Sequence, residues 1–255
     1  MPPHAYLYGI PYELYKKYKI RRYGFHGTSH RYVSERAAKM LGKPIEQLKM
    51  VTAHLGNGCS MAAVNGGRSV DTTMGFTPLE GLIMGTRSGD MDPSVILYIM
   101  AKEGLSLSEA NTLLNKHSGL IGISGESSDM REIEEAIGEG NKKAKYAFDV
   151  FTYRIKKYVG AYAAAMGGLD ALVFTGGIGE NSVMVRNDVC SNMEFLGINL
   201  DESANQNVKG ECVISAADSK VSILRIPTNE ELVIALDTEE IVSEQMAVKE
   251  VANVK

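Results

Sequence analysis

The feature that most constrains the fold is a block of three short apolar segments separated by glycine turns. Residues 49–54, 59–64 and 68–73 are rich in strand-forming side chains, and the turns between them are Gly56-Asn57-Gly58 and Asn65-Gly66-Gly67. Glycine and asparagine between two apolar runs are a strong hairpin signal. The block therefore predicts a meander of three antiparallel strands.

Helices and two further strands are predicted around this meander, which gives an α/β chain. Asp92 is a good N-cap because Pro93 follows at the first helical position, and Thr228 with Glu231 fits a capping box. The predicted helices cover residues 11–20, 30–41 and 92–115 and begin near 129, 141 and 228, and the predicted strands cover 171–174 and 221–226. Apolar residues at helical spacing predict that the helix from 141 to 166 is buried along one face.

Composition excludes several classes of function. The chain has 255 residues, 44% of them hydrophobic, and a net charge of -4, which disfavours a partner such as nucleic acid. No apolar run reaches the roughly 20 residues of a membrane span, so no membrane partner is expected. Three widely spaced cysteines predict neither disulfides nor a thiolate metal site. We therefore expect a cytoplasmic protein.

Two glycine-bearing loops each follow a predicted strand, at residues 56–60 and 176–181. Glycine allows backbone N–H groups to approach an anion, so the pair suggests a nucleotide, although either loop alone fits a tight turn equally well. The second loop lacks the third glycine of a dinucleotide fingerprint, because Ser182 stands there. Neither loop matches the P-loop pattern.

Charged and polar side chains outside these loops are further candidates. Arg87, set between glycines, is the first choice to contact a moving phosphoryl group, whose negative charge suits a guanidinium fork; the alternative is an ordinary surface arginine. His26 and His30 are four residues apart without the glutamate of a zinc hydrolase motif. His26 is a candidate hydrogen-bond donor to an anion, whereas His30 is expected to be structural.

Four motifs together resemble the acetate kinase family. They are Arg22 to His30 (RYGFHGTSH), His54 to Gly58 (HLGNG), Asp71 to Gly81 (DTTMGFTPLEG) and Phe174 to Asn181 (FTGGIGEN). The similarity extends over essentially the whole chain. It implies the actin-like ATPase fold, which is ribonuclease H-like: a mixed sheet with a three-strand antiparallel meander flanked by helices.

The resemblance also implies roles for individual residues. His26 and Arg87 would contact the transferring phosphoryl group, and Glu230 would help to hold Mg²⁺. The nucleotide, ATP or ADP, would be bound by His54, Leu55, Gly56, Asn57, Gly58, Asp129, Met130, Arg131, Gly177, Ile178, Gly179 and Asn181. Asp129 has an alternative role as a plain helix cap, because Glu132 follows three residues later.

The implied reaction is the reversible conversion of ATP and acetate into ADP and acetyl phosphate by a homodimer formed through the C-terminal domain. Residues 1–48 would be the remnant of an N-terminal domain with a substrate-site segment, and residues 49–255 the nucleotide-binding domain. Since the missing domain normally supplies catalytic groups, we expect the chain alone to be a weak kinase or inactive. The alternatives are a propionate or butyrate kinase and a non-catalytic nucleotide-binding or dimerisation fragment.

Overall fold

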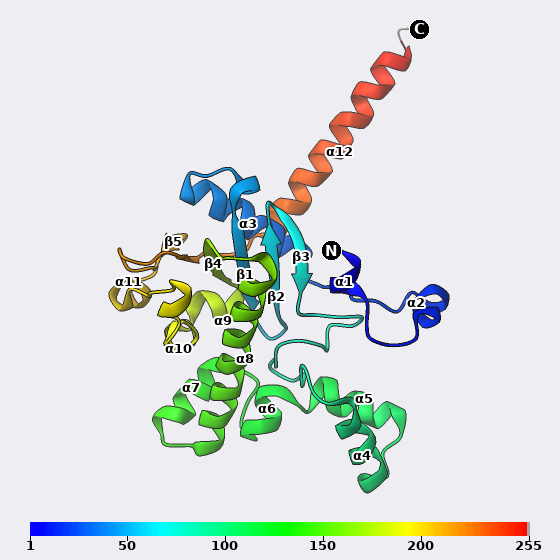
Figure 1. Ribbon diagram of the computed structural model, residues 1–255, viewed down its shortest axis with the longest axis vertical. Helices are drawn as coiled ribbons and strands as arrows, with labels where there is room; N and C mark the ends of the chain where they lie inside the picture. The colour runs from blue at the N-terminus through cyan, green and yellow to red at the C-terminus, as the bar shows by residue number, and fades with distance from the viewer. Residues whose placement is uncertain (254–255) are drawn as a thin grey trace.

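The computed structural model describes the backbone of residues 1–253 and the side chains of residues 1–243. At its centre is a six-stranded mixed sheet in the order β3-β2-β1-β4-β6-β5 (Figure 1). The strands are β1 (Lys49–Leu55), β2 (Cys59–Asn65), β3 (Arg68–Thr72), β4 (Ala171–Thr175), β5 (Cys212–Val213) and β6 (Ser222–Arg225).

The predicted meander is confirmed, since β1 pairs antiparallel with β2 and β2 with β3. Beyond it the direction changes: β1 pairs parallel with β4, and β4 pairs parallel with β6. The carboxyl ends of β1 and β4 therefore lie next to each other, with His54 opposite Thr175. The sheet brings the two glycine-bearing loops together at the edge formed by the carboxyl ends of its central strands, where open α/β sheets usually bind their ligands.

Helices cover both faces of the sheet. Side chains along a strand alternate between the two faces, and both faces carry apolar side chains that need to be buried. On one face, Phe151 and Ile155 of the long helix α8 belong to the larger core with Val51 and Phe174 of the strands. On the other face, Val33 of α3 belongs to the smaller core. The helices of the chain are α1 (Pro3–Tyr6), α2 (Tyr12–Tyr18), α3 (Gly27–Leu41), α4 (Pro93–Glu103), α5 (Leu107–Lys116), α6 (Gly119–Ser124), α7 (Met130–Gly138), α8 (Lys142–Met166), α9 (Gly176–Asn181), α10 (Val183–Cys190), α11 (Glu202–Gln206) and α12 (Glu230–Asn253).

One predicted helix is in fact two. The expected helix over residues 92–115 is broken at Gly104, whose left-handed conformation ends α4, and Ser106 starts α5 with a capping box. Glycine adopts positive φ without steric cost and is therefore a common helix terminator. The resulting hairpin of α4 and α5 projects away from the sheet (Figure 1).

The predicted capping box at Thr228 is also wrong. The Oδ1 atom of Asn229 accepts the hydrogen bond from the N–H of Leu232, so Asn229 caps α12. The backbone N–H of Thr228 donates instead to the carboxylate of Glu180, 3.3 Å away, which holds this residue outside the helix. Of the helices in the described part of the chain, none is both long enough and apolar enough to span a membrane.

Candidate functional site

The second glycine-bearing turn lies directly against the end of β1, where the first turn begins. Gly176 has φ of +76°, and a Cβ on it would lie 2.8 Å from the carbonyl oxygen of Leu55. A residue with a side chain is strained in that conformation and would collide with the backbone of β1. Gly176 therefore allows α9 to begin directly against the end of β1.

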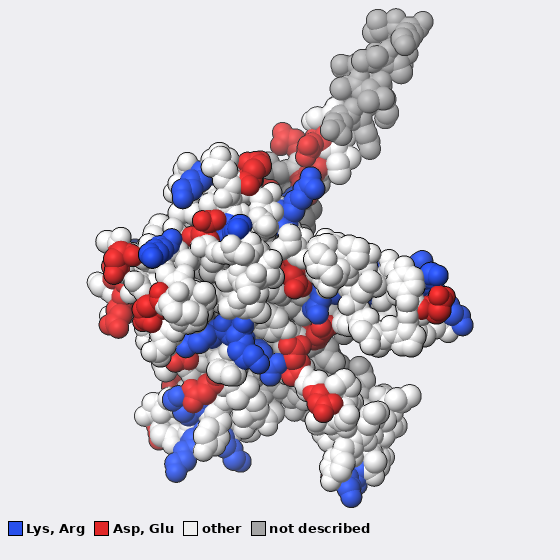
Figure 2. Space-filling model, viewed as in Figure 1, with Lys and Arg blue, Asp and Glu red and all other residues white. Residues whose placement is uncertain are grey.

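A cleft of about 620 Å³ opens between these turns and α7. Its volume falls in the range of small-molecule sites. The cleft is lined by Gly56, Asn57, Ser128, Asp129, Met130, Arg131, Glu134, Gly177, Ile178, Asn181 and Ser182. Arg131 is the basic side chain in this lining. The Lys and Arg atoms that gather at the centre of Figure 2 lie over α8. The structure thus brings the three segments of the predicted nucleotide site together.

Four residues of the predicted nucleotide set do not line the cleft: His54, Gly58, Leu55 and Gly179. The side chain of Leu55 is fully buried in the larger core. Gly179 is buried as well, and a Cβ there would lie 3.5 Å from the backbone carbon of Phe174. Leu55 and Gly179 pack α9 on the sheet.

Asp129 and Arg131 contact each other at the rim of the cleft. The Asp129 carboxylate accepts a hydrogen bond from the backbone N–H of Arg131 and caps α7. It also accepts one from the Arg131 guanidinium at 2.6 Å. The hydrogen bonds from Arg131 lower the pKa of Asp129. The cap predicted as an alternative role is therefore present, next to the cleft.

The buried Arg186 holds the second turn through hydrogen bonds to its backbone. This side chain is fully buried, and its guanidinium donates to the carbonyl oxygens of Gly179 and Glu180 at 3.0 and 2.9 Å. It also donates to the side chain of Asn205 at 2.6 Å. Burial, with help from Arg225, lowers the pKa of Arg186 to about 10. At neutral pH a charged group therefore fixes the end of α9.

Glu180 connects the second turn to the start of α12. Its carboxylate accepts hydrogen bonds from the backbone N–H groups of Gly176 and Thr228, at 3.0 and 3.3 Å. The first contact satisfies one of the free N–H groups at the start of α9. Glu230 follows two residues after Thr228, so this carboxylate links the placement of the nucleotide loop to that of Glu230.

The first turn faces the predicted phosphoryl site. A Cβ on Gly58 would lie 3.4 Å from Nη1 of Arg87 and 3.7 Å from Nε2 of His26. Gly58 therefore keeps a space open between these two side chains. Arg87 is half-buried and donates to the carbonyl oxygen of Pro78 at 3.2 Å. Within the side chains described, no carboxylate forms an ion pair with Arg87, which leaves its charge available to an anion.

Three histidines cluster beside this space. The rings of His26 and His54 are stacked, with centroids 4.1 Å apart, and His30 lies edge-on to His54. His26 is bonded through Nδ1 to Ser60 Oγ at 2.9 Å, and His54 through Nδ1 to Ser29 Oγ at 2.8 Å. The Nε2 atom of His54 lies 3.9 Å from the point where a Cβ on Gly56 would stand.

All three histidines are neutral near pH 7. Burial lowers the pKa of His30 to about 3 and that of His54 to about 4. Burial also lowers the pKa of His26, and the nearby Arg87 lowers it further, while Glu230 acts in the opposite direction. These side chains therefore offer hydrogen bonds to an anion without adding charge.

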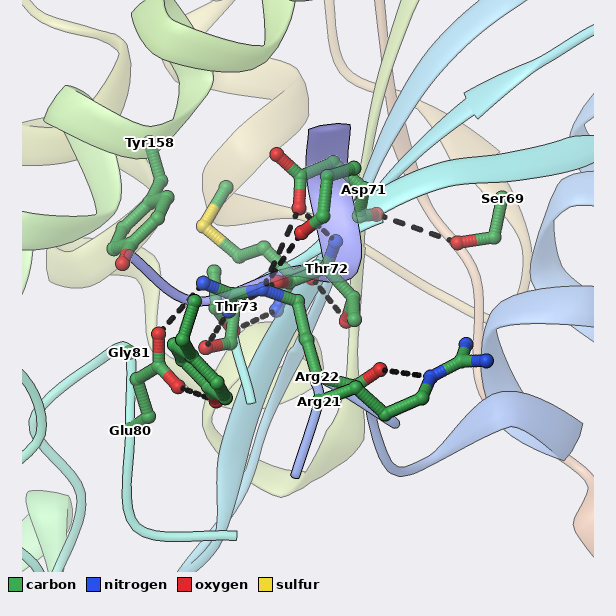
Figure 3. Close-up of polar contacts among 12 residues, drawn as sticks. Arg21, Arg22, Ser69, Asp71, Thr72, Thr73, Glu80, Gly81 and Tyr158 are labelled. Carbon is green, nitrogen blue, oxygen red and sulfur yellow. Dashed lines mark hydrogen bonds and ion pairs between the residues drawn. The ribbon is translucent and has the colours of Figure 1, made fainter. Parts of the chain in front are cut away.

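The loop that carries Arg87 is fixed by a network around Arg22 (Figure 3). The Arg22 guanidinium donates to Glu80 at 2.6 Å and to the carbonyl oxygens of Thr72 and Thr73 at 2.8 and 3.0 Å. Glu80 follows two residues after Pro78, the residue that accepts from Arg87. At the other end of the loop, Tyr158 donates to Asp90. The network thus holds both flanks of the loop.

Glu230 is the candidate metal ligand. It is exposed at the start of α12, close enough to His26 to affect its pKa, and within the described side chains no residue pairs with its carboxylate. No group of three or more His, Cys, Asp and Glu side chains in this part of the chain could hold a metal ion. A single carboxylate suits Mg²⁺ that bridges nucleotide phosphates, because Mg²⁺ keeps several water ligands.

Sequence reasoning missed the supports of the site. Thr52 stands in no motif, whereas Ser29 lies inside the first motif and Ser60 ends the first glycine-bearing loop. For all three, only their place beside the histidines in space shows their role. Glu180 stands inside the motif of the second loop, so the sequence could have identified it as part of the site. Arg186 could not have been identified, because nothing in the sequence marks an arginine as buried.

Comparison with known proteins gives a consistent result. The acetokinase family matches residues 1–236. Acetate kinase of Symbiobacterium thermophilum is 59% identical over 242 residues, which are 95% of this chain and 61% of that protein. The solved structure of an acetate kinase of Porphyromonas gingivalis is similar at 54% identity with a TM-score of 0.93, over 95% of this chain and 61% of that one. The structure of a propionate kinase of Francisella tularensis is similar at 49% identity with a TM-score of 0.87, over 92% of this chain and 60% of that one.

Proposed function

The chain belongs to the acetokinase family, and from this premise we propose that its cleft serves reversible phosphoryl transfer from ATP to acetate, giving ADP and acetyl phosphate. The observation that carries the proposal is the meeting of three segments at one edge of the sheet. The two glycine turns and Arg87 lie around adjoining space, with Asn57 on the nucleotide side and Gly58 on the side of Arg87.

Each part of the cleft has a task in this proposal. The nucleotide base and sugar occupy the space between Met130 and Ile178, and the phosphates extend past Asn57. The transferring group then lies next to Gly58, where Arg87 stabilises the charge that spreads over its oxygens. His26 and His54 donate hydrogen bonds there. Glu230 would hold Mg²⁺, which neutralises phosphate charge when bound.

The chain spans 61% of the length of the Symbiobacterium relative. Phosphoryl transfer depends on groups positioned around the whole transition state. We therefore propose that these 255 residues alone turn over weakly or not at all. Hydroxylamine trapping of acetyl phosphate measures this, and turnover near that of a full-length relative would contradict it. Activity restored by adding the remaining part of a relative as a separate polypeptide would support the proposal.

Binding of ADP tests the site independently of turnover. Calorimetry with millimolar ADP should show weak binding, because most of the proposed adenosine contacts lie in this chain. The matched variants are Ile178→Ala, in the cleft, and Val213→Ala, an exposed residue of β5. Only Ile178→Ala should weaken binding. A folded chain that binds no ADP would overturn the nucleotide site.

A propionate kinase is the second candidate, supported by the Francisella structure at 49% identity. The ratio of rates with acetate and propionate, measured on the complemented chain, decides between the two. A non-catalytic nucleotide-binding fragment would bind ADP and never recover activity. The homodimer, the cytoplasmic location and the division into residues 1–48 and 49–255 stay predictions; residues 254 and 255 lie outside the described residues.

A further inference from the structure

A continuous chain of hydrogen bonds runs from the interior of the sheet to the space beside Gly58. Thr52 Oγ1 lies 2.8 Å from Nδ1 of His30, and Nε2 of His30 lies 2.7 Å from Ser60 Oγ. Ser60 Oγ in turn lies 2.9 Å from Nδ1 of His26. Thr52 and Ser60 are fully buried and His30 nearly so, which shields the two bonds of His30 from water, while the bond to the half-buried His26 is partly buried.

Only two arrangements of protons make these three bonds and also give the buried Ser60 proton an acceptor. A neutral histidine has one donor and one acceptor nitrogen, and each hydroxyl has one proton to donate. Ser60 could accept from both rings, but its buried O–H would then have no acceptor among the described residues. With the Ser60 proton used in one of its two bonds, all three bonds run in the same direction, either from Thr52 toward His26 or from His26 toward Thr52. In the first case the His26 proton is on Nε2, and in the second it is on Nδ1.

Thr52 decides between the two arrangements. In the part of the chain whose side chains are described, its hydroxyl has one hydrogen-bond partner, Nδ1 of His30. If the bonds ran toward Thr52, its buried O–H would have no acceptor, which is unfavourable because a buried donor without a partner is not compensated for its lost hydration. Thr52 therefore donates to His30, His30 donates through Nε2 to Ser60, and Ser60 donates to Nδ1 of His26. The free nitrogen of His26 then carries a proton.

The same argument about donors and acceptors applies to His54. Ser29 is fully buried, and its Oγ has one described partner, Nδ1 of His54 at 2.8 Å. The Ser29 hydroxyl must donate to this nitrogen, since no other acceptor is described for it. His54 therefore also carries its proton on Nε2. That atom lies beside Gly56, as Nε2 of His26 lies beside Gly58.

We propose that Thr52, His30, Ser60 and Ser29 are positioning residues that fix His26 and His54 as neutral Nε2–H donors facing the first glycine turn. An anionic group beside Gly58 then meets two N–H donors and the Arg87 guanidinium, and no lone pair of these rings repels it. The inference rests on the proposed function only for the identity of the anion, a phosphoryl group. The direction of the hydrogen bonds is a property of the chain without ligand.

Nitrogen-15 NMR of histidine-labelled protein tests the assignment directly. Long-range proton–nitrogen spectra of the 255-residue chain at pH 7, without ligand, distinguish a protonated ring nitrogen from an unprotonated one. The expected result is Nε2–H for His26, His30 and His54. A proton on Nδ1 of His26 or His54 would overturn the proposal.

Substitution of the deciding hydroxyl tests why the tautomer is chosen. Thr52→Val keeps the shape and removes the donor, so Nδ1–H forms of His26 and His30 should become detectable. The control is Thr152→Val, a buried threonine of α8 whose hydroxyl donates to the backbone of Phe148, and it should leave all three histidines unchanged. Unchanged tautomers in Thr52→Val would show that Thr52 does not set the direction.

Inorganic phosphate tests the anion and separates this inference from the proposed function. Titration with phosphate should shift the Nε2 signals of His26 and His54 in the wild type and much less in Arg87→Ala. No shift in the wild type would overturn the role of the two donors. The predicted tautomers combined with no ADP binding would contradict the proposed function and support the assignment of the hydrogen bonds.

Discussion

The two glycine turns at the edge of the sheet follow neighbouring parallel strands, yet glycine serves a different purpose in each. In the first turn, Gly58 leaves open the space between Arg87 and His26. In the second, Gly176 adopts a left-handed conformation against the backbone of Leu55. The first turn thus provides room for a ligand, whereas the second provides a backbone conformation. Substitutions should affect binding in the first turn and stability in the second.

The largest effect on the free energy of unfolding is expected at Arg186, which is bonded to the backbone of the second turn. Arg186→Met removes the donor from the carbonyl oxygens of Gly179 and Glu180 and from the side chain of Asn205. Unsatisfied buried acceptors should lower the free energy of unfolding by about 4 kcal/mol. Urea unfolding measures this. The control Arg68→Met, at an exposed residue of β3, should change it by less than about 0.5 kcal/mol. Equal losses of unfolding free energy in both variants would show that the hydrogen bonds of Arg186 to the second turn do not stabilise the fold.

A direct contrast inside the second turn should give the next largest effect. Gly176→Ala forces a side chain into positive φ and against the Leu55 carbonyl, and should cost about 3 kcal/mol of unfolding free energy. Gly177→Ala is the matched control, because a Cβ there meets nothing within 4 Å. It should change stability by less than about 1 kcal/mol. A tolerated alanine at residue 176 would mean that its conformation is not required.

The histidines beside the first turn predict a dependence of stability on pH. The pKa of His54 falls from 6.5 in the unfolded chain to about 4 in the folded one. Below pH 6.5 the unfolded chain therefore binds more protons, and the free energy of unfolding decreases as the pH falls toward 4. His54 should contribute about 1.4 kcal/mol per pH unit in this window.

Thermal or urea unfolding between pH 4.5 and 7.5 measures that slope. His54→Gln should reduce it by the contribution of one histidine, while the exposed control His117→Gln should leave it unchanged. Identical slopes in the wild type and His54→Gln would show that His54 is not held neutral by folding.

The smallest effect is expected at Gly58. Gly58→Ala introduces no positive φ, and its Cβ would stand 3.4 Å from Arg87, so stability should change by less than about 1 kcal/mol. Binding of inorganic phosphate should weaken about tenfold, which is about 1.4 kcal/mol, because the methyl group occupies the anion's space. The control Gly138→Ala, in α7, has no neighbour within 4 Å of the new Cβ. Unchanged phosphate binding in Gly58→Ala would place the anion elsewhere.

The sequence predicted what depends on local pattern. The meander followed from two turns between apolar runs, and the two loops after β1 and β4 were recognisable as candidates for anion binding. Their different uses of glycine could not be predicted, because Gly176 is constrained by Leu55, 121 positions away. The start of α12 was misplaced for the same reason: the carboxylate of Glu180 holds Thr228, so Asn229 becomes the cap.

Hydrogen–deuterium exchange with and without ADP tests the central claim, that both glycine turns belong to one nucleotide site. The account predicts that ADP slows exchange of backbone amides in residues 56–60, 128–134 and 176–182 together, while the amides of β5 remain unchanged. Protection of one turn without the other, or protection confined to segments outside the cleft, would contradict it.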